Sequence, residues 1–351
     1  MRIEQITFTR FLAALSIVIF HFGEKIAPFS NHNISFLFKQ ANVGVSYFFI
    51  LSGFVMIIAY GNKDQIDPLE YFKNRFARIY PVYLLAIVLL LIYLIYNSLT
   101  IDYSGLYLNI FAMQSWVPGK ALSFNRPGWS LSVEWLFYFS FPFLFNYLYK
   151  KFDFKKLIFP IILFWVISQL LLHTGAKTDF YKGFPSKSHD LLFYFPLMHL
   201  SEFLIGNLAG LYFINNWKDK KINTDIYIVL AVLLFGLWLK FNHYFILHNG
   251  LLAIIFIPLI ILIAINSGSI TKMFNYKFCV FLGEISYGIY ILQIPVYRWS
   301  EDLFDCMKIK NESAIFYLYL IILLLFSCVS FLFIEKPIRV FIKKWKSMSL
   351  D

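Results

Sequence analysis

The sequence predicts an all-helical bundle that crosses a membrane about ten times. Of its 351 residues, 60% are hydrophobic and only 15% are charged, whereas a soluble domain has roughly 45–50% apolar and about 25% charged residues. Apolar runs of about 17–22 residues recur along the chain, and an α-helix of that length crosses the hydrocarbon core of a bilayer. Phenylalanine (42 residues) and tyrosine (23 residues) are abundant, as in the aromatic belts at membrane interfaces.

The ten expected spans are separated by polar loops. They cover residues 6–23, 43–61, 80–97, 130–149, 157–173, 192–214, 225–241, 249–266, 278–299 and 314–334. The first span is expected to stay in the mature protein, because no small-residue cleavage site follows it. The chain ends soon after the tenth span, so we expect one membrane-embedded domain over residues 1–351 and no appended soluble domain. The apolar segment 106–113, in the long outer loop, is expected to be re-entrant or interfacial.

The basic residues predict the orientation of the chain. The net charge is +11, and lysine and arginine concentrate in alternate loops, at 63–78, 150–156, 218–221, 272–277 and 336–346. These loops are therefore expected to be cytoplasmic, with both termini inside, which requires an even number of spans. Nucleic-acid binding is disfavoured, because no soluble domain presents a basic surface.

The sequence predicts neither a metal site nor a structural disulfide. Its three cysteines are Cys279, Cys306 and Cys328. Their spacing fits no zinc or CxxC pattern.

Two polar residues make the first span a functional candidate. Arg10 and His21 are eleven residues apart. In an α-helix this is about three turns, so both side chains are expected on one face, roughly 16 Å apart along the axis. A cation and an imidazole are costly inside a membrane helix and mark functional positions. The alternative is that His21 only caps the helix at the membrane interface.

A carboxylate in the fourth span is the next candidate. Glu134 lies in the segment RPGWSLSVEWLFYFSFP, residues 126–142, about five residues into the span. It needs a partner or a proton there. The predicted topology puts Glu134 and His21 at similar depth toward the outer face. A carboxylate beside an imidazole fixes its tautomer, so we hypothesise that Glu134 orients His21; a purely structural glutamate is the alternative.

Arg75 and Arg78 are three residues apart and so share a helical face. Two guanidinium groups at this spacing suit a phosphate, although ordinary cytoplasmic anchoring explains them equally well. In the second span, Ser52 and Gly53 interrupt an aromatic run. Gly53 is expected to serve helix packing, and Ser52 either packing or substrate binding.

Three later polar residues are weaker candidates. His199 and Glu202 are three residues apart on the sixth span and could form a second polar site. Glu335 is interpreted mainly as a boundary residue, because it stands at the end of the last span beside Lys336.

These residues, in this order, resemble the acyltransferase 3 family of integral-membrane enzymes that O-acylate surface carbohydrates. Arg10 and His21 fit its Arg-x10-His motif, and Arg75 and Arg78 fit its Arg-x-x-Arg motif. The matching segments are FFILSGF at 48–54, WSLSVEW at 129–135 and GEISYGIYILQIP at 283–295. The resemblance covers nearly the whole chain. One departure is Gln293, where many members carry histidine; glutamine does not titrate, so it receives no proton-transfer role.

The resemblance implies that acyl-CoA, most often acetyl-CoA, is the donor and that a carbohydrate hydroxyl is the acceptor. It implies that Arg10, Arg75 and Arg78 hold the donor on the cytoplasmic side. His21, oriented by Glu134, would be the general base or would itself carry the acyl group. The substrate-binding residues expected from the matching segments are Ser52, Trp129, Ser130 and Tyr287. The expected location is the bacterial cytoplasmic membrane, surrounded by lipid.

Two functions from other classes compete with this interpretation. Intramembrane Arg, His and Glu also line the pathways of proton-coupled secondary transporters of small anions or sugars. The sequence shows no repeat between its halves and no paired broken helices, which such transporters often have. The other competitor is a flippase or structural subunit of a polysaccharide export machine.

Overall fold

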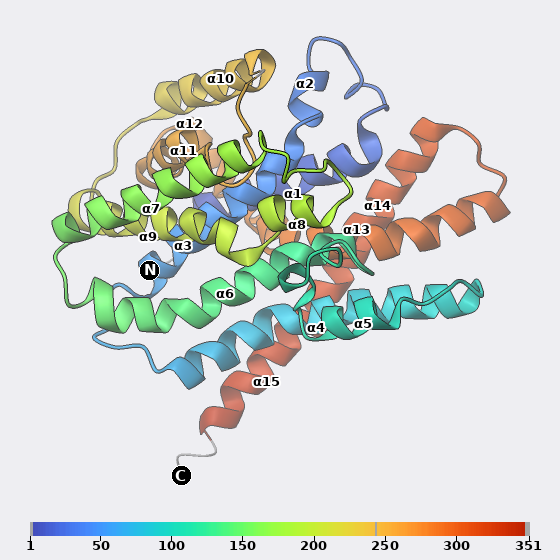
Figure 1. Ribbon diagram of the computed structural model, residues 1–351, viewed down its shortest axis with the longest axis horizontal. Helices are drawn as coiled ribbons and strands as arrows, with labels where there is room; N and C mark the ends of the chain where they lie inside the picture. The colour runs from blue at the N-terminus through green and yellow to red at the C-terminus, as the bar shows by residue number, and fades with distance from the viewer. Residues whose placement is uncertain (1–2, 243, 348–351) are drawn as a thin grey trace.

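Helices form almost all of the regular structure in the computed structural model, which describes residues 3–242 and 244–347. Within these residues the β-structure amounts to an isolated bridge between Ile222 and Asn266. The predicted all-helical class is therefore confirmed. Figure 1 shows long helices packed side by side, several of them running roughly along the longest axis.

The α-helices are listed here with their bounds. They are α1 (Glu4–Val18), α2 (Ser35–Phe38), α3 (Gly44–Tyr60), α4 (Pro68–Tyr96), α5 (Tyr103–Ile110), α6 (Trp129–Leu144), α7 (Phe154–Gly175), α8 (Lys187–Phe193), α9 (Pro196–Asn216), α10 (Asp225–Phe241), α11 (Ala253–Ile265), α12 (Ser269–Phe274), α13 (Lys277–Cys306), α14 (Glu312–Ser330) and α15 (Lys336–Ser347). Three π-helical turns extend α1, α6 and α14, at Ile19–Gly23, Phe145–Tyr149 and Phe331–Glu335. Short 3₁₀ turns lie at Ala41–Val43, Gln114–Trp116 and Arg126–Gly128.

Each of the ten predicted ranges contains a helix. In the described part of the chain, seven helical segments are long and apolar enough to cross a membrane: Glu4–Gly23, Ala41–Tyr60, Pro68–Tyr96, Phe154–Gly175, Lys187–Asn216, Lys277–Cys306 and Glu312–Ile342. The other three predicted ranges hold α6, α10 and α11. Of these, α10 has 17 residues and α11 has 13, both below the length that usually crosses a bilayer without help from neighbours.

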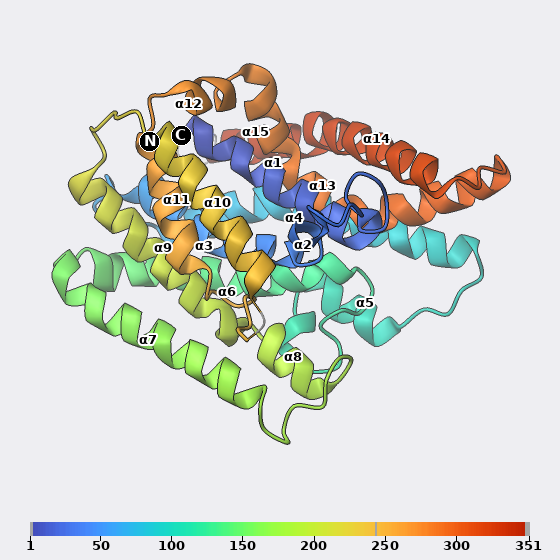
Figure 2. The same cartoon turned by 90° about the horizontal axis from the view of Figure 1, so that it is seen from above.

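The first and last helices share one end of the molecule. Helix α1 begins and α15 ends toward the left in both Figure 1 and Figure 2. An even number of crossings between them would give this arrangement.

Small residues bring α3 and α9 into close contact at the centre of the bundle. A Cβ atom added to Gly53 would lie 2.2 Å from the carbonyl oxygen of Phe203, and one added to Gly206 would lie 2.1 Å from that of Ile50. Both distances are far below van der Waals contact with backbone atoms that cannot rotate away. Gly53 therefore serves helix packing, as expected from its place in the second span.

Substituting Gly206 with alanine is expected to destabilise the protein by about 1–3 kcal/mol or more, because the two backbones must separate. Thermal unfolding of the purified variant in detergent measures this. Gly236→Ala is the matched control, since a Cβ there meets its nearest atom, in Leu37, at 3.8 Å. Equal melting temperatures for the two variants would contradict the packing argument.

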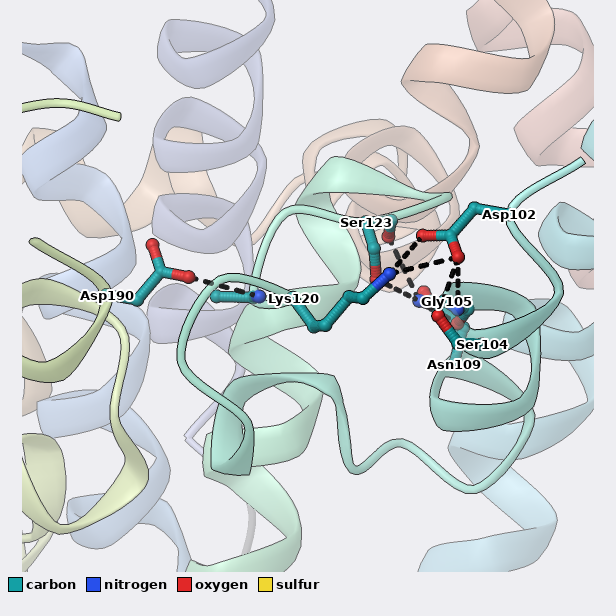
Figure 3. Close-up of polar contacts among 8 residues, drawn as sticks. Asp102, Ser104, Gly105, Asn109, Lys120, Ser123 and Asp190 are labelled. Carbon is teal, nitrogen blue, oxygen red and sulfur yellow. Dashed lines mark hydrogen bonds and ion pairs between the residues drawn. The ribbon is translucent and has the colours of Figure 1, made fainter. Parts of the chain in front are cut away.

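The outer loop between α4 and α6 folds inward and is held by hydrogen bonds. Helix α5, which carries most of the apolar segment 106–113, lies beside α4 (Figure 1). The buried Asn109 donates to Ser123 O at 3.0 Å, and Asp102 pairs with Lys120 at 2.8 Å (Figure 3). Ser132, on α6, donates to Ala112 O at 2.6 Å. These hydrogen bonds attach the loop to the bundle, and α6 begins at the buried residue Trp129.

Candidate functional site

Four cavities follow one another through the bundle, and each shares lining residues with the next. The first, which we call the inner cavity, has about 240 Å³ and is lined by Arg10, Arg78, Glu284, Glu335 and Arg339. The arginine cavity, of about 100 Å³, follows and is lined by Arg10, Ser52, Arg75, Arg78, Glu134, Tyr138 and Tyr287. Next come the neck, of about 30 Å³, lined by Arg10, Phe48, Ser130, Glu134 and Tyr287, and the histidine cavity, of about 460 Å³, lined by His21, Arg126, Trp129, His189, Tyr194, His248 and Tyr290.

The order of the cavities follows the order of residues along the helices. On α1, Arg10 lines the inner cavity, the arginine cavity and the neck, and His21, in the π-turn that extends α1, lines the histidine cavity. On α13, Glu284, Tyr287 and Tyr290 come in the same order. The series therefore follows α1 from its first turns to the π-turn that extends it.

The arginine cavity brings together all three residues predicted to hold the donor. Arg10 from α1 and both Arg75 and Arg78 from α4 line it, together with Ser52 and Tyr287. The convergence of three guanidinium groups from two helices gives this cavity a strongly cationic wall, which suits phosphate or another anion.

Arg75 is held by aromatic rings and keeps a nitrogen free for a ligand. The guanidinium carbon lies 5.2 Å from the ring centroid of Tyr71 and 5.8 Å from those of Tyr60 and Tyr138. These cation–π contacts stabilise the charge. Its Nε atom is buried and has no hydrogen-bond partner among the described residues. An unpartnered buried donor is unusual and is expected to be satisfied by a bound group.

Glu134 belongs with the arginines and not with His21. Its Oε2 accepts a hydrogen bond from Tyr138 Oη at 2.7 Å, and it lines the arginine cavity and the neck. The hypothesis that Glu134 orients His21 therefore fails in this structure. The predicted topology put the two residues at similar depth. In the structure Trp129, the first residue of α6, lines the histidine cavity, and Glu134 lies five residues, or about 7.5 Å, further along the helix.

His21 takes its partner from α13. It lies in the π-turn Ile19–Gly23 and is exposed in the histidine cavity. Its Nδ1 lies 2.7 Å from Oε1 of Gln293, whose Nε2 donates to the carbonyl of Tyr290 at 2.6 Å. Because the amide nitrogen is occupied, the amide oxygen faces the ring and Nδ1 must carry the proton. The other ring nitrogen, Nε2, is then the one that can accept a proton.

Gln293→Leu is expected to lower kcat for the reaction proposed below about tenfold, because it removes one hydrogen bond worth about 1–1.5 kcal/mol from His21. Gln293→Glu is the matched variant: it keeps an acceptor for Nδ1–H and is expected to retain most of the activity. Steady-state rates of both variants, after a check of folding by size exclusion, measure the effect. Equal rates for the leucine variant and the unmodified protein would remove the positioning role.

The remaining predicted substrate residues lie on both sides of the neck. Trp129 is buried in the wall of the histidine cavity, and Ser130 lines the neck. The Ser130 hydroxyl donates to Pro127 O at 3.0 Å, so it also stabilises the start of α6. Tyr287 lines the neck and the arginine cavity, and its hydroxyl donates to Ile79 O at 3.0 Å.

His199 and Glu202 form a buried polar network behind Trp129. His199 Nδ1 lies 2.6 Å from Glu202 Oε2, and Ser46 donates to the other carboxylate oxygen. The ring of His199 packs 5.2 Å from that of Trp129. The sequence suggested that these two residues could form a second polar site; in the structure they support the wall of the histidine cavity and do not line it.

Several cavity residues were missed from the sequence. His189 and His248 line the histidine cavity from α8 and from the segment before α11. Arg339 and Glu335, 3.4 Å apart, line the inner cavity, although Glu335 was interpreted as a boundary residue. None of them has a regular spacing to Arg10 or His21, so no motif connects them.

Comparison with known proteins identifies relatives along the whole chain. The sequence profile of a family described as an acyltransferase domain matches residues 3–338. The chain is 28% identical over 231 residues to acyltransferase MdmB of Streptomyces mycarofaciens, which covers 60% of this chain and 57% of that protein. It is 25% identical over 341 residues to O-acetyltransferase OatA of Staphylococcus aureus, which covers 85% of this chain and 52% of the relative. The chain thus spans little more than half the length of these curated relatives. No solved structure matches it significantly.

Proposed function

Because this chain belongs to the acyltransferase 3 family and is an integral membrane protein, we propose that it moves an acyl group, most simply acetyl, from cytoplasmic acyl-CoA to a hydroxyl of a carbohydrate at the outer face. The name of one relative, O-acetyltransferase OatA, supports O-acetylation. The bacterial cytoplasmic membrane is the proposed location, with ten spans and both termini inside.

The observation that carries the proposal is the series of cavities from the arginines to His21. Acyl-CoA has a phosphate-bearing end and a long thin arm that ends in the thioester. The three arginines of the arginine cavity, with Arg339 in the inner cavity, suit the phosphates. The arm would then extend through the neck toward the histidine cavity, where the acceptor would bind.

The proposed chemistry uses the free nitrogen of His21. Nε2 removes the proton of the acceptor hydroxyl while the oxygen attacks the thioester carbonyl. The tetrahedral intermediate collapses, the C–S bond breaks, and the CoA thiolate leaves and takes up a proton from the imidazolium. Gln293 holds Nδ1–H throughout. Acyl transfer to Nε2 itself, followed by transfer to the acceptor, uses the same geometry; accumulation of labelled acyl-enzyme without an acceptor separates the two routes.

Glu134 has a different role in this proposal from the one first expected. Placed beside Arg10, Arg75 and Arg78, its carboxylate offsets their mutual repulsion before the donor binds. It also lines the neck, so it contacts the arm of the donor rather than the reacting hydroxyl.

Purified protein in nanodiscs, given labelled acetyl-CoA and a panel of glycans, tests the proposal. The expected result is acceptor-dependent release of CoA with label in the glycan. Glycan mass spectrometry of cells with and without the gene supplies the acceptor and the mass of the acyl group. No change in any envelope glycan, together with uptake of a small anion or sugar into proteoliposomes, would favour a transporter instead.

A further inference from the structure

A fifth cavity, of about 640 Å³, opens next to the histidine cavity. We call it the mouth. Residues of the folded outer loop line one side, and residues 184–187 with Asp190 line the other. Leu122, Arg126 and Phe184 line both the mouth and the histidine cavity. The mouth therefore continues the series beyond His21, and its size is that of a ligand pocket.

Both carboxylates of the mouth already have partners (Figure 3). Asp102 accepts from Lys120 Nζ at 2.8 Å and from the backbone N–H of Gly105 at 3.0 Å. The Lys120 ammonium, then the Gly105 N–H and the Ser104 hydroxyl, lower the pKa of Asp102 to about 2. Asp190 accepts from the N–H of Gly119 at 2.7 Å. The two aspartates therefore hold the loop from opposite sides (Figure 3), and both carboxylates already accept hydrogen bonds from the loop.

Two cations of the mouth have no such partner. Arg126, in the 3₁₀ turn before α6, and Lys187, at the start of α8, make no ion pair or side-chain hydrogen bond with any described residue. Both are exposed. Arg126 stands at the junction with the histidine cavity. An anionic group held there would keep the rest of its molecule within reach of His21.

We propose that the mouth binds the acceptor through an anionic substituent, so that the acceptor is an acidic sugar carrying a carboxylate or a phosphate, held by Arg126 and Lys187. The role of the bound sugar as the acyl acceptor rests on the proposed transferase function, but the binding of an anionic sugar at this site does not depend on it. The fixed loop wall is preorganised, so little ordering opposes binding.

Binding of small sugars to the protein in nanodiscs, without acyl-CoA, tests the site. The probes are glucose, glucuronate, glucose 6-phosphate and inorganic phosphate, followed by tryptophan fluorescence or calorimetry. Glucuronate or glucose 6-phosphate is expected to bind at least about tenfold more tightly than glucose, with affinity that falls as salt increases. Which of the two binds better tells carboxylate from phosphate.

Arg126→Gln and Lys187→Gln are each expected to weaken the binding of the acidic sugar about tenfold. Lys182→Gln is the matched control, an exposed lysine of the same segment outside the mouth, and is expected to change nothing. Equal affinity for glucose and the acidic sugars, or indifference to both substitutions, overturns the proposal. Inorganic phosphate that binds as tightly as glucose 6-phosphate overturns its sugar part.

The two proposals fail differently. Acyl transfer to a neutral glycan that is insensitive to Arg126→Gln would leave the transferase standing and reject the acidic acceptor. Charge-dependent sugar binding without any acyl transfer would leave the site standing and reject the transferase.

Discussion

Replacing His21 with alanine is expected to lower kcat for acyl transfer by about 10²- to 10⁴-fold, the usual contribution of a positioned general base. The structure supplies the reason: Gln293 fixes the Nδ1–H tautomer at 2.7 Å and leaves Nε2 as the proton acceptor in the histidine cavity. Acceptor-dependent CoA release in nanodiscs measures the loss.

His32→Ala is the matched control, because His32 is an exposed histidine of the loop that follows the first span. It is expected to keep the full rate. His21→Ala protein that is correctly folded by size exclusion and thermal unfolding, yet as active as the unmodified enzyme, would refute the mechanism for either route.

The double substitution Arg75→Ala with Arg78→Ala is expected to raise KM for acyl-CoA by about 100-fold or more, since each charge-assisted hydrogen bond contributes about 1.5–3 kcal/mol and at least two are lost. The KM for the acceptor should change little, because both arginines line the arginine cavity, on the far side of the neck from His21. Initial rates with each substrate varied in turn give the two constants.

Two further variants test whether the change in KM comes from loss of the guanidinium groups, from loss of positive charge or from a general effect on the helix. Arg75→Lys with Arg78→Lys keeps the charges but not the planar fork, so an intermediate KM is expected. Lys73→Ala, an exposed cation on the same helix that does not line the cavity, should leave KM unchanged. A larger effect on the acceptor than on acyl-CoA would contradict the donor site.

The positions of the helices could be predicted from the sequence because apolar runs in a bilayer admit little else. Each of the ten expected ranges holds a helix, although only seven helical segments of the described chain reach spanning length and hydropathy. The shortfall lies in α6, α10 and α11. Hydropathy reports apolarity, but it does not report where a helix begins relative to its neighbours.

The arginine cavity was also predictable in outline. Arg10, Arg75, Arg78, Ser52 and Tyr287 were singled out as donor or substrate residues, and all of them line it. Local spacing suffices for Arg75 and Arg78, which share one helix face. The proximity of Arg10 to these two residues depends on packing between α1, α4 and α13. Local spacing does not predict that packing, and Arg10 was grouped with them through the resemblance to the family.

The partner of His21 was beyond the reach of sequence reasoning. Gln293 is 272 residues away, and a glutamine in an apolar helix resembles a packing residue. The π-turn that carries His21 also changes its direction from the α-helical one assumed for Arg10 and His21. Such turns often occur at functional positions, and neither hydropathy nor spacing reveals them.

The narrowness of the neck has a consequence for the cell that houses this protein. At about 30 Å³, the neck has room for one or two water molecules, and Phe48 and Phe49 form part of its wall. A continuous water column between the arginine and histidine cavities would dissipate the proton gradient across the bilayer. A neck of this volume limits the water between the two cavities to one or two molecules, and under the proposed function the slender acyl-bearing arm of the donor would displace them.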